Sequence, residues 1–283
     1  MSTLSELFND PTPLRTVLRI ALRAANVGSY SFRYGIGAVH RPNYAYLVYQ
    51  AALLARRLGE PRVSVVELGV AGGAGLLALE SHAEEVERLL GVKVEIYGFD
   101  TGEGLPEPEG YRDLPYHWKA GFYRMDVGSL RSKLRRSTLI IGDIRETIDG
   151  FIDRYQPAPL GAVSYDLDFY SSTMAGLKLL EIASTNILPR VFLYFDDTMG
   201  GDLELYNDHT GARLAICEFN SSHEARKMSP LYYLRALAPQ RWHHRMWSLH
   251  NFDHPAYGQF ISVENQQLPI YRTARQQLEG PAA

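Results

Sequence analysis

The sequence predicts an α/β fold with a doubly wound, mostly parallel β-sheet. Its clearest sign is the stretch 65–75, a short apolar run that ends in an acid and then breaks into glycines at Gly69, Gly72, Gly73 and Gly75. Glycines permit positive φ and a close approach of backbone to ligand, as a tight turn between a strand and a helix requires. Later apolar runs end in acidic residues, as expected where parallel strands open on one ligand-binding edge.

Two helices are expected before the glycine run. Apolar residues at helical spacing predict an amphipathic helix over 13–26, and Pro42 is well placed to begin a second helix that ends near Gly59. The segment 27–41 between them contains three glycines and three aromatic residues. We predict a loop there. It could close over a site, or its tyrosines could pack into the edge of the core.

Helices and strands alternate after the glycine turn. The predicted elements are, in order, a helix over 75–90, a strand over 93–100, a short helix over 130–134, strands over 138–141, 162–165 and 190–195, and helices over 211–218 and 231–237. The polar, aromatic segment 107–124 is predicted to be a loop. Two strands, over 246–252 and 259–264, are expected to form a closing antiparallel hairpin.

We expect one domain with additions. Residues 1–60 would form an N-terminal helical extension, residues 61–275 the main domain, and residues 276–283 a flexible tail. The histidines between 243 and 254 lack a clean metal-ligand spacing, and we interpret them as structural or surface residues.

Composition and charge limit the class of protein. A chain of 283 residues, 46% hydrophobic and 22% charged, is typical of one large globular α/β domain. The formal net charge of −3 argues against nucleic acid or a membrane surface as partner and favours a small molecule. The single Cys217 excludes an intramolecular disulfide and a cysteine-rich zinc site. Because neither a signal peptide nor a long apolar run is present, we expect a soluble, cytoplasmic protein.

The spacing around the glycines distinguishes between nucleotides. It does not fit the Gly-x-Gly-x-x-Gly fingerprint of dinucleotide-binding folds. Glu67 stands two residues before Gly69, and this Glu-x-Gly-x-x-Gly pattern resembles the first strand of class I S-adenosylmethionine (SAM) methyltransferases. By that resemblance Glu67, Gly69 and Gly73 would bind SAM. Asp100, at the end of the next strand, would accept hydrogen bonds from the ribose hydroxyls. A glycine-rich turn in any doubly wound protein is the alternative.

Asp143 directly follows the predicted strand over 138–141. Its carboxylate could accept a hydrogen bond from the adenine amino group of SAM. It could equally cap the helix that begins there. Asp143 is therefore a candidate cofactor ligand with two open interpretations.

Two further strands end in pairs of acids. Asp166 and Asp168 follow one of them, and Asp196 and Asp197 follow the next. Carboxylates this close raise one another's pKa unless a cation neutralises them. Oxygen ligands without cysteine or regularly spaced histidine favour Mg²⁺, Mn²⁺ or Ca²⁺ over zinc. The alternative is that Asp168 caps a helix and Asp197 binds backbone in the turn.

Four landmarks together resemble the macrocin-type sugar O-methyltransferases, a metal-dependent family that methylates sugar hydroxyls of macrolide and aminocoumarin antibiotics. They are residues 66–73, 97–106, 166–173 and 196–197. The resemblance covers roughly residues 60–220. It implies a class I methyltransferase Rossmann-like fold with SAM and a divalent cation as cofactors. It also implies a glycosylated small molecule as substrate and a homodimer or higher homo-oligomer.

The same resemblance assigns roles to the acids. Asp166, Asp196 and Asp197 would be the metal ligands. Asp168 would be the general base that takes the proton from the sugar hydroxyl.

The chain departs from the family pattern beside the expected acceptor site. Leu167 stands where the family usually has glycine, and Thr198 where a tyrosine usually follows the paired acids. Residues 199–210 are additional. These departures leave SAM and metal binding intact and put the identity of the acceptor in doubt.

Three other hypotheses remain. A cephalosporin-hydroxylase-like member of the same superfamily would have a similar sequence. A nucleotide-sugar glycosyltransferase could use Asp166 and Asp168 as its Asp-x-Asp motif, but Glu67 and the glycine turn would then have no role. An inactive SAM-binding scaffold is disfavoured because all four acids are present.

Overall fold

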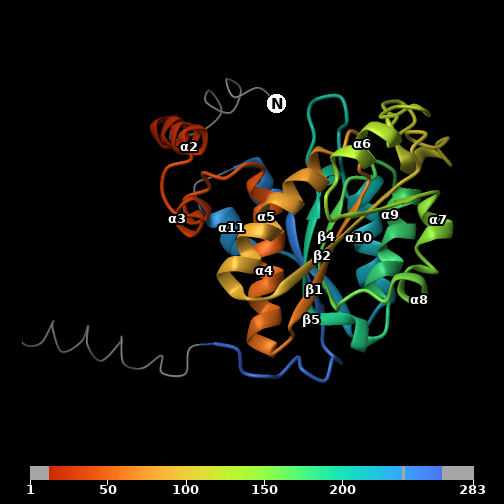
Figure 1. Ribbon diagram of the computed structural model, residues 1–283. Helices are drawn as coiled ribbons and strands as arrows, with labels where there is room; N and C mark the ends of the chain where they lie inside the picture. Colours follow the sequence, from red (N-terminus) through yellow and green to blue (C-terminus); the bar gives the residue numbers. More distant parts are fainter. Residues whose placement is uncertain (1–12, 238–239, 263–283) are drawn as a thin grey trace, which may run out of the picture.

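A seven-stranded sheet organises the fold (Figure 1). The structure is a computed structural model that describes residues 13–237 and 240–262. The strands are β1 (Arg62–Leu68), β2 (Lys93–Asp100), β3 (Thr138–Ile141), β4 (Leu160–Tyr165), β5 (Ile187–Phe195), β6 (Arg226–Pro230) and β7 (Met246–Asn251). Their order is β3-β2-β1-β4-β5-β7-β6. β1 to β5 run parallel, and β7 is antiparallel to both β5 and β6.

Helices cover both faces of the sheet (Figure 1). The α-helices are α2 (Pro13–Ala25), α3 (Tyr30–Gly35), α4 (Pro42–Leu58), α5 (Ala74–Leu90), α6 (Val127–Lys133), α7 (Ile144–Thr147), α8 (Phe151–Tyr155), α9 (Tyr170–Leu177), α10 (Gly211–Ser222) and α11 (Tyr232–Ala236). The 3₁₀ helices are η1 (Tyr111–Asp113), η2 (Lys178–Leu180), η3 (Ser184–Asn186), η4 (Asp196–Thr198) and η5 (Arg241–Arg245). α4 and α5 bury their apolar side chains against one face, and α8, α9 and α10 against the other. Among these described helices, none combines the length and apolar character needed to cross a membrane.

Elements with strong local signals lie where the sequence predicts them. α4 begins at Pro42 and ends before Gly59, whose φ of 83° is the left-handed conformation of a helix C-cap. β2 and β3 occupy the predicted ranges 93–100 and 138–141. The mostly parallel sheet with an antiparallel addition near the C-terminus confirms the predicted fold class.

The predicted second strand of the C-terminal hairpin is wrong over residues 259–262, which form no strand. The rest of that prediction, like the predicted tail over 276–283, lies outside the described residues. The partner of β7 is instead β6, where Met228 lies opposite Leu249. β6 is a short edge strand that ends in Pro230, a residue tolerated at an edge because its missing N–H breaks no ladder. The sequence of β6 is polar and has no strand pattern of its own. Pairing with β7 therefore determines that this segment forms a strand.

The predicted loop over residues 27–41 contains the helix α3. The Ser29 hydroxyl accepts a hydrogen bond from the Phe32 backbone N–H at 3.2 Å, which caps the first turn. Tyr30 is buried, and Tyr34 stacks on Tyr49 of α4 with ring centroids 4.3 Å apart. The tyrosines of this segment therefore pack into the edge of the core. Closure of the segment over the site stays a prediction.

His82 on α5 is expected to make the fold sensitive to acid. Its buried ring places Nε2 2.7 Å from the carbonyl oxygen of His40 and Nδ1 3.1 Å from the hydroxyl of Tyr30. Neutral imidazole satisfies both contacts, and burial lowers the pKa of His82 from 6.5 to about 4. Because the unfolded chain binds the proton at higher pH, the free energy of unfolding should fall by about 3 kcal/mol as the pH drops through this range.

Urea denaturation between pH 7 and pH 4 measures this effect. The variant His82→Gln cannot titrate at this position, so its stability should depend less steeply on pH than that of the wild type. Identical pH dependence in the two proteins would show that His82 does not contribute.

Candidate active site

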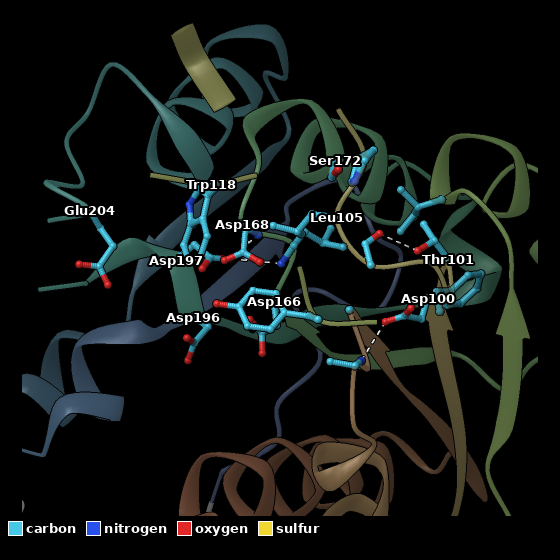
Figure 2. A pocket seen from close by; sticks show the side chains of 18 of the residues that line it. Asp100, Thr101, Leu105, Trp118, Asp166, Asp168, Ser172, Asp196, Asp197 and Glu204 are labelled. Carbon is cyan, nitrogen blue, oxygen red and sulfur yellow. Dashed lines mark hydrogen bonds between the residues drawn. The ribbon is translucent and has the colours of Figure 1, made fainter. Parts of the chain in front are cut away.

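A cavity of about 410 Å³ opens at the carboxyl edge of the parallel strands (Figure 2). Its volume lies within the roughly 300–1,000 Å³ typical of small-molecule sites. The neighbours β1 and β4 form the switch point of the strand order, where helices leave toward opposite faces and a crevice results. The residues that line it include Gly69, Asp100, Leu105, Trp118, Tyr123, Asp143, Asp166, Asp168, Asp196, Asp197, Met199, Glu204, Tyr206 and Arg245.

The glycine turn and Asp100 form one side of the cavity. Gly69 has a φ of 83°, and a Cβ there would lie 1.8 Å from the carbonyl oxygen of Asp166. Only glycine therefore lets the end of β1 approach the end of β4 so closely. The Asp100 carboxylate accepts hydrogen bonds from the backbone N–H groups of Val70 at 2.9 Å and Ala71 at 2.8 Å. Asp100 thus fixes the turn and also faces the cavity.

Glu67 lies behind this turn. It is 2% exposed, and its Oε1 accepts a hydrogen bond from the Tyr44 hydroxyl at 2.6 Å. Burial raises the pKa of Glu67 to about 8, against the effect of the Tyr44 hydrogen bond. Gly75 passes directly over the carboxylate, since a Cβ there would lie 1.7 Å from Oε1. The structure therefore shows Glu67 supporting the turn from inside.

Gly73 has a similar supporting position. It precedes α5 in the left-handed conformation, with a φ of 81°, and a Cβ there would lie 2.1 Å from Leu130. The described residues that line the cavity do not include Gly73 or Glu67. Direct contact of these two residues with a cofactor stays a prediction.

Asp143 lies at the start of α7, beside the cavity. Its carboxylate accepts a hydrogen bond from the backbone N–H of Arg145 at 2.8 Å, which confirms that it caps α7. Its hydrogen bonds with the Arg145 side chain lower the pKa of Asp143. The residue also lines the cavity. A cofactor in the cavity would therefore meet a carboxylate already fixed in place.

The acids at the ends of β4 and β5 form an acid cluster on the other side of the cavity (Figure 2). One carboxylate oxygen from each of Asp166, Asp196 and Asp197 lies within 4.8 Å of the other two. Oxygens that coordinate Mg²⁺ or Ca²⁺ at about 2.0–2.6 Å are separated by at most about 4–5 Å. The three predicted metal ligands are thus brought together, and their spacing and chemistry fit a hard divalent cation.

Asp197 also organises the backbone of the cluster. Its Oδ2 accepts hydrogen bonds from the N–H groups of Leu167 at 3.2 Å and Asp168 at 2.8 Å. Its Oδ1 accepts one from the Tyr206 hydroxyl at 3.2 Å. The predicted backbone-binding role of Asp197 is therefore confirmed.

Asp168 does not cap a helix. Phe169 precedes α9, and the side chain of Asp168 is not part of that cap. Asp168 is buried and has a φ of 59°, an uncommon conformation for a residue with a side chain. Such strain is often found at functional sites, and here the hydrogen bond to Asp197 maintains it.

Desolvation and mutual repulsion dominate the electrostatics of the cluster. The Asp166 side chain is exposed to the cavity. Desolvation and the charges of Asp197 and Asp196 raise the pKa of Asp166 well above its ordinary value. Desolvation and the charges of Asp197 and Asp166 also raise the pKa of Asp168. A bound divalent cation would relieve this repulsion.

The sequence did not point to several residues of the site. Trp118 and Tyr123 reach the cavity from the predicted loop over 107–124, and Tyr206 reaches it from the additional segment 199–210. Arg245 forms an ion pair with Asp196. Aromatic residues in the loops were the only available signal, because the contacts join segments far apart in the chain.

Comparisons with known proteins bear on the fold. No protein-family model matches the sequence, and no curated protein sequence matches it. The crystal structure of CalS11, a calicheamicin methyltransferase, superposes with a TM-score of 0.51 at 20% identity, covering 88% of this chain and 89% of that chain. The O-methyltransferase TomG from Streptomyces achromogenes, in complex with SAM, gives a TM-score of 0.43 at 14% identity over 84% of this chain and 88% of that one. The first similarity shows that this chain has the class I methyltransferase Rossmann-like fold.

Proposed function

We propose that this protein is a SAM-dependent, divalent-cation-dependent O-methyltransferase that acts on a hydroxyl of a sugar or a sugar-bearing natural product. The observation that carries the proposal is the composition of one cavity. It joins the glycine turn and Asp100 on one side to the acid cluster on the other. The fold and the resemblance of the landmark motifs to macrocin-type sugar O-methyltransferases support the same function.

The cofactor half of the cavity suits the ribose and adenine of SAM. Gly69 lines the cavity at the end of β1, so backbone there can approach a bound cofactor closely. The Asp100 carboxylate is held by the backbone N–H groups of Val70, Ala71 and Gly102, and its remaining lone pairs can accept hydrogen bonds from ribose hydroxyls. Asp143 stands along the same wall and can accept one from the adenine amino group. SAM would supply a methyl group bound to a sulfonium sulfur. When the acceptor oxygen takes the methyl group, the sulfur leaves as the thioether of S-adenosylhomocysteine.

The other half of the cavity suits deprotonation of a hydroxyl. Asp166, Asp196 and Asp197 would hold the cation, which would act as a Lewis acid and lower the pKa of the acceptor hydroxyl. Asp168 would accept the hydroxyl proton while the oxygen bonds to the methyl carbon. The cation would relieve the repulsion that raises the pKa of Asp168, so that Asp168 would be ionised and able to accept the proton, and the rigid turn fixes its position.

The rim of the cavity suits an acceptor with both polar and apolar faces. Trp118, Tyr123 and Tyr206 line it with aromatic rings, and Glu204 adds a carboxylate. Tyr116 links the segments 107–124 and 199–210, because its hydroxyl donates a hydrogen bond to the Glu204 carbonyl oxygen at 2.6 Å. A sugar ring has apolar faces and hydroxyl edges, which such a wall can contact together.

Calorimetric titration with SAM and S-adenosylhomocysteine tests the cofactor assignment. We expect saturable binding to the wild type. Binding to Asp100→Ala should be weaker by about 1.5–3 kcal/mol, since hydrogen bonds to a charged acceptor are lost. Asp126 provides a matched control, because it caps α6 and does not line the cavity, so Asp126→Ala should bind normally. The absence of heat with either ligand at millimolar concentration would contradict the proposed function.

A further inference from the structure

Arg245 reaches the acid cluster because of the antiparallel strand β7. In the register of β5 and β7, Met246 lies opposite Tyr194. Arg245 is the last residue of η5 and directly precedes β7, so it lies beside the end of β5. Asp196 directly follows Phe195, the last residue of β5. The strand order therefore places the Arg245 guanidinium group at the edge of the sheet where the acid cluster lies.

The contacts of Arg245 join the acid cluster to the additional segment 199–210. Its Nη1 forms an ion pair with Oδ1 of Asp196 and lies 3.2 Å from the Tyr194 hydroxyl. Its Nη2 donates a hydrogen bond to the carbonyl oxygen of Met199. The Tyr194 hydroxyl also donates to Oδ1 of Asp196, at 2.6 Å. Arg245 thus contacts one oxygen of Asp196 and the first residue of the segment 199–210.

The charge of Arg245 is well shielded from solvent. Its side chain is 18% exposed, compared with 35% for Asp196. Within residues 13–237 and 240–262, Asp166, Asp168 and Asp197 take part in no salt bridge, so Arg245 supplies the one cationic side chain paired with the cluster. A guanidinium stays protonated at any pH at which the protein is folded. The cluster therefore contains a permanent positive charge.

We propose that Arg245 is an internal counter-cation that keeps the acid cluster assembled without a divalent cation and limits the affinity for that cation. The inference rests on the cation site of the proposed function. Two effects of removing Arg245 oppose each other. Loss of a nearby like charge strengthens cation binding, whereas loss of a partner frees the side chain of Asp196.

The charge effect should dominate. The repulsion between charges a few ångströms apart remains large even at an effective dielectric constant of about 20. Ordering one short side chain involves a much smaller free energy. Moreover, the Tyr194 hydroxyl still holds Oδ1 of Asp196 when Arg245 is absent. Removal of the guanidinium should therefore tighten cation binding, although it removes a contact of a cation ligand.

The test compares Arg245→Gln, Arg245→Lys and a control variant. Arg213→Gln is the matched control, because Arg213 forms an ion pair with Asp208 and does not line the cavity. Each protein is freed of metal with EDTA and dialysed. Its melting temperature is then measured with and without Mg²⁺, and its Kd for Mn²⁺ is measured by calorimetry.

Arg245→Gln should have a lower melting temperature than Arg213→Gln in the metal-free state, and Mg²⁺ should restore it. Its Kd for Mn²⁺ should be at least about tenfold lower than that of the wild type. Arg245→Lys retains the charge, so its Kd should stay within about threefold of the wild type.

An unchanged or higher Kd for Mn²⁺ in Arg245→Gln would overturn the inference. If Arg245→Gln does not fold, a tenfold lower Kd in Arg245→Lys would overturn it as well, because the charge is still present there. Absence of Mn²⁺ binding in every protein would overturn both the inference and the cation site. S-adenosylhomocysteine binding would then report separately on the methyltransferase assignment.

Discussion

Replacement of Asp168 by Asn is expected to lower kcat by roughly 10²–10⁴-fold, the range typical for loss of a general base. The amide cannot accept the hydroxyl proton. The variant should nevertheless keep its affinity for the cation and for SAM, because the three predicted metal ligands and Asp100 are unchanged. Asn is nearly isosteric with Asp and tolerates the left-handed conformation at φ 59°. The backbone N–H of residue 168 also keeps its hydrogen bond to Asp197.

Steady-state kinetics with the best acceptor from a sugar panel, together with Mn²⁺ and S-adenosylhomocysteine titrations, separate these effects. Thermal melting checks that Asp168→Asn is folded. A wild-type kcat in this variant would remove Asp168 as the base and leave the cation site in place.

Replacement of Asp166 by Asn is expected to abolish both cation binding and methyl transfer. One of three anionic ligands is lost, and an amide oxygen is a much weaker partner for a hard cation. Asp166 is the best ligand to test because its carboxylate opens to the cavity. Asp197, in contrast, also holds the backbone of Leu167 and Asp168, so its loss would disturb the turn.

The sign of the stability change makes this test specific. Desolvation and repulsion raise the pKa of Asp166, so the metal-free Asp166→Asn protein should melt at a higher temperature than the metal-free wild type. Mg²⁺ should stabilise the wild type and leave the variant unchanged. Equal Mn²⁺ affinities in the two proteins would show that Asp166 is not a ligand.

Local patterns were sufficient to predict the parallel part of the fold and the acid cluster. Apolar runs define β1 to β5, and the carboxyl ends of parallel strands share one edge, so residues that follow β4 and β5 must come together. Asp166 and Asp196 therefore come together although they are far apart in the chain. The glycine turn was predictable for the same reason, because its conformation is specified within a few residues.

The remaining features depend on contacts that a local pattern does not contain. β6 is polar and exists because β7 pairs with it. The position of Arg245 depends on the register between β5 and β7. Glu67 faces Tyr44, which is 23 residues earlier in the chain, so its inward direction was not visible in the motif around it.

The most direct test of the proposed function is methyl transfer from isotope-labelled SAM to a panel of sugars and glycosylated natural products, with Mg²⁺ and with excess EDTA. We predict a methylated product that forms with Mg²⁺, disappears in EDTA, and returns when Mg²⁺ is restored. Undiminished product formation in excess EDTA would contradict a cation held by Asp166, Asp196 and Asp197.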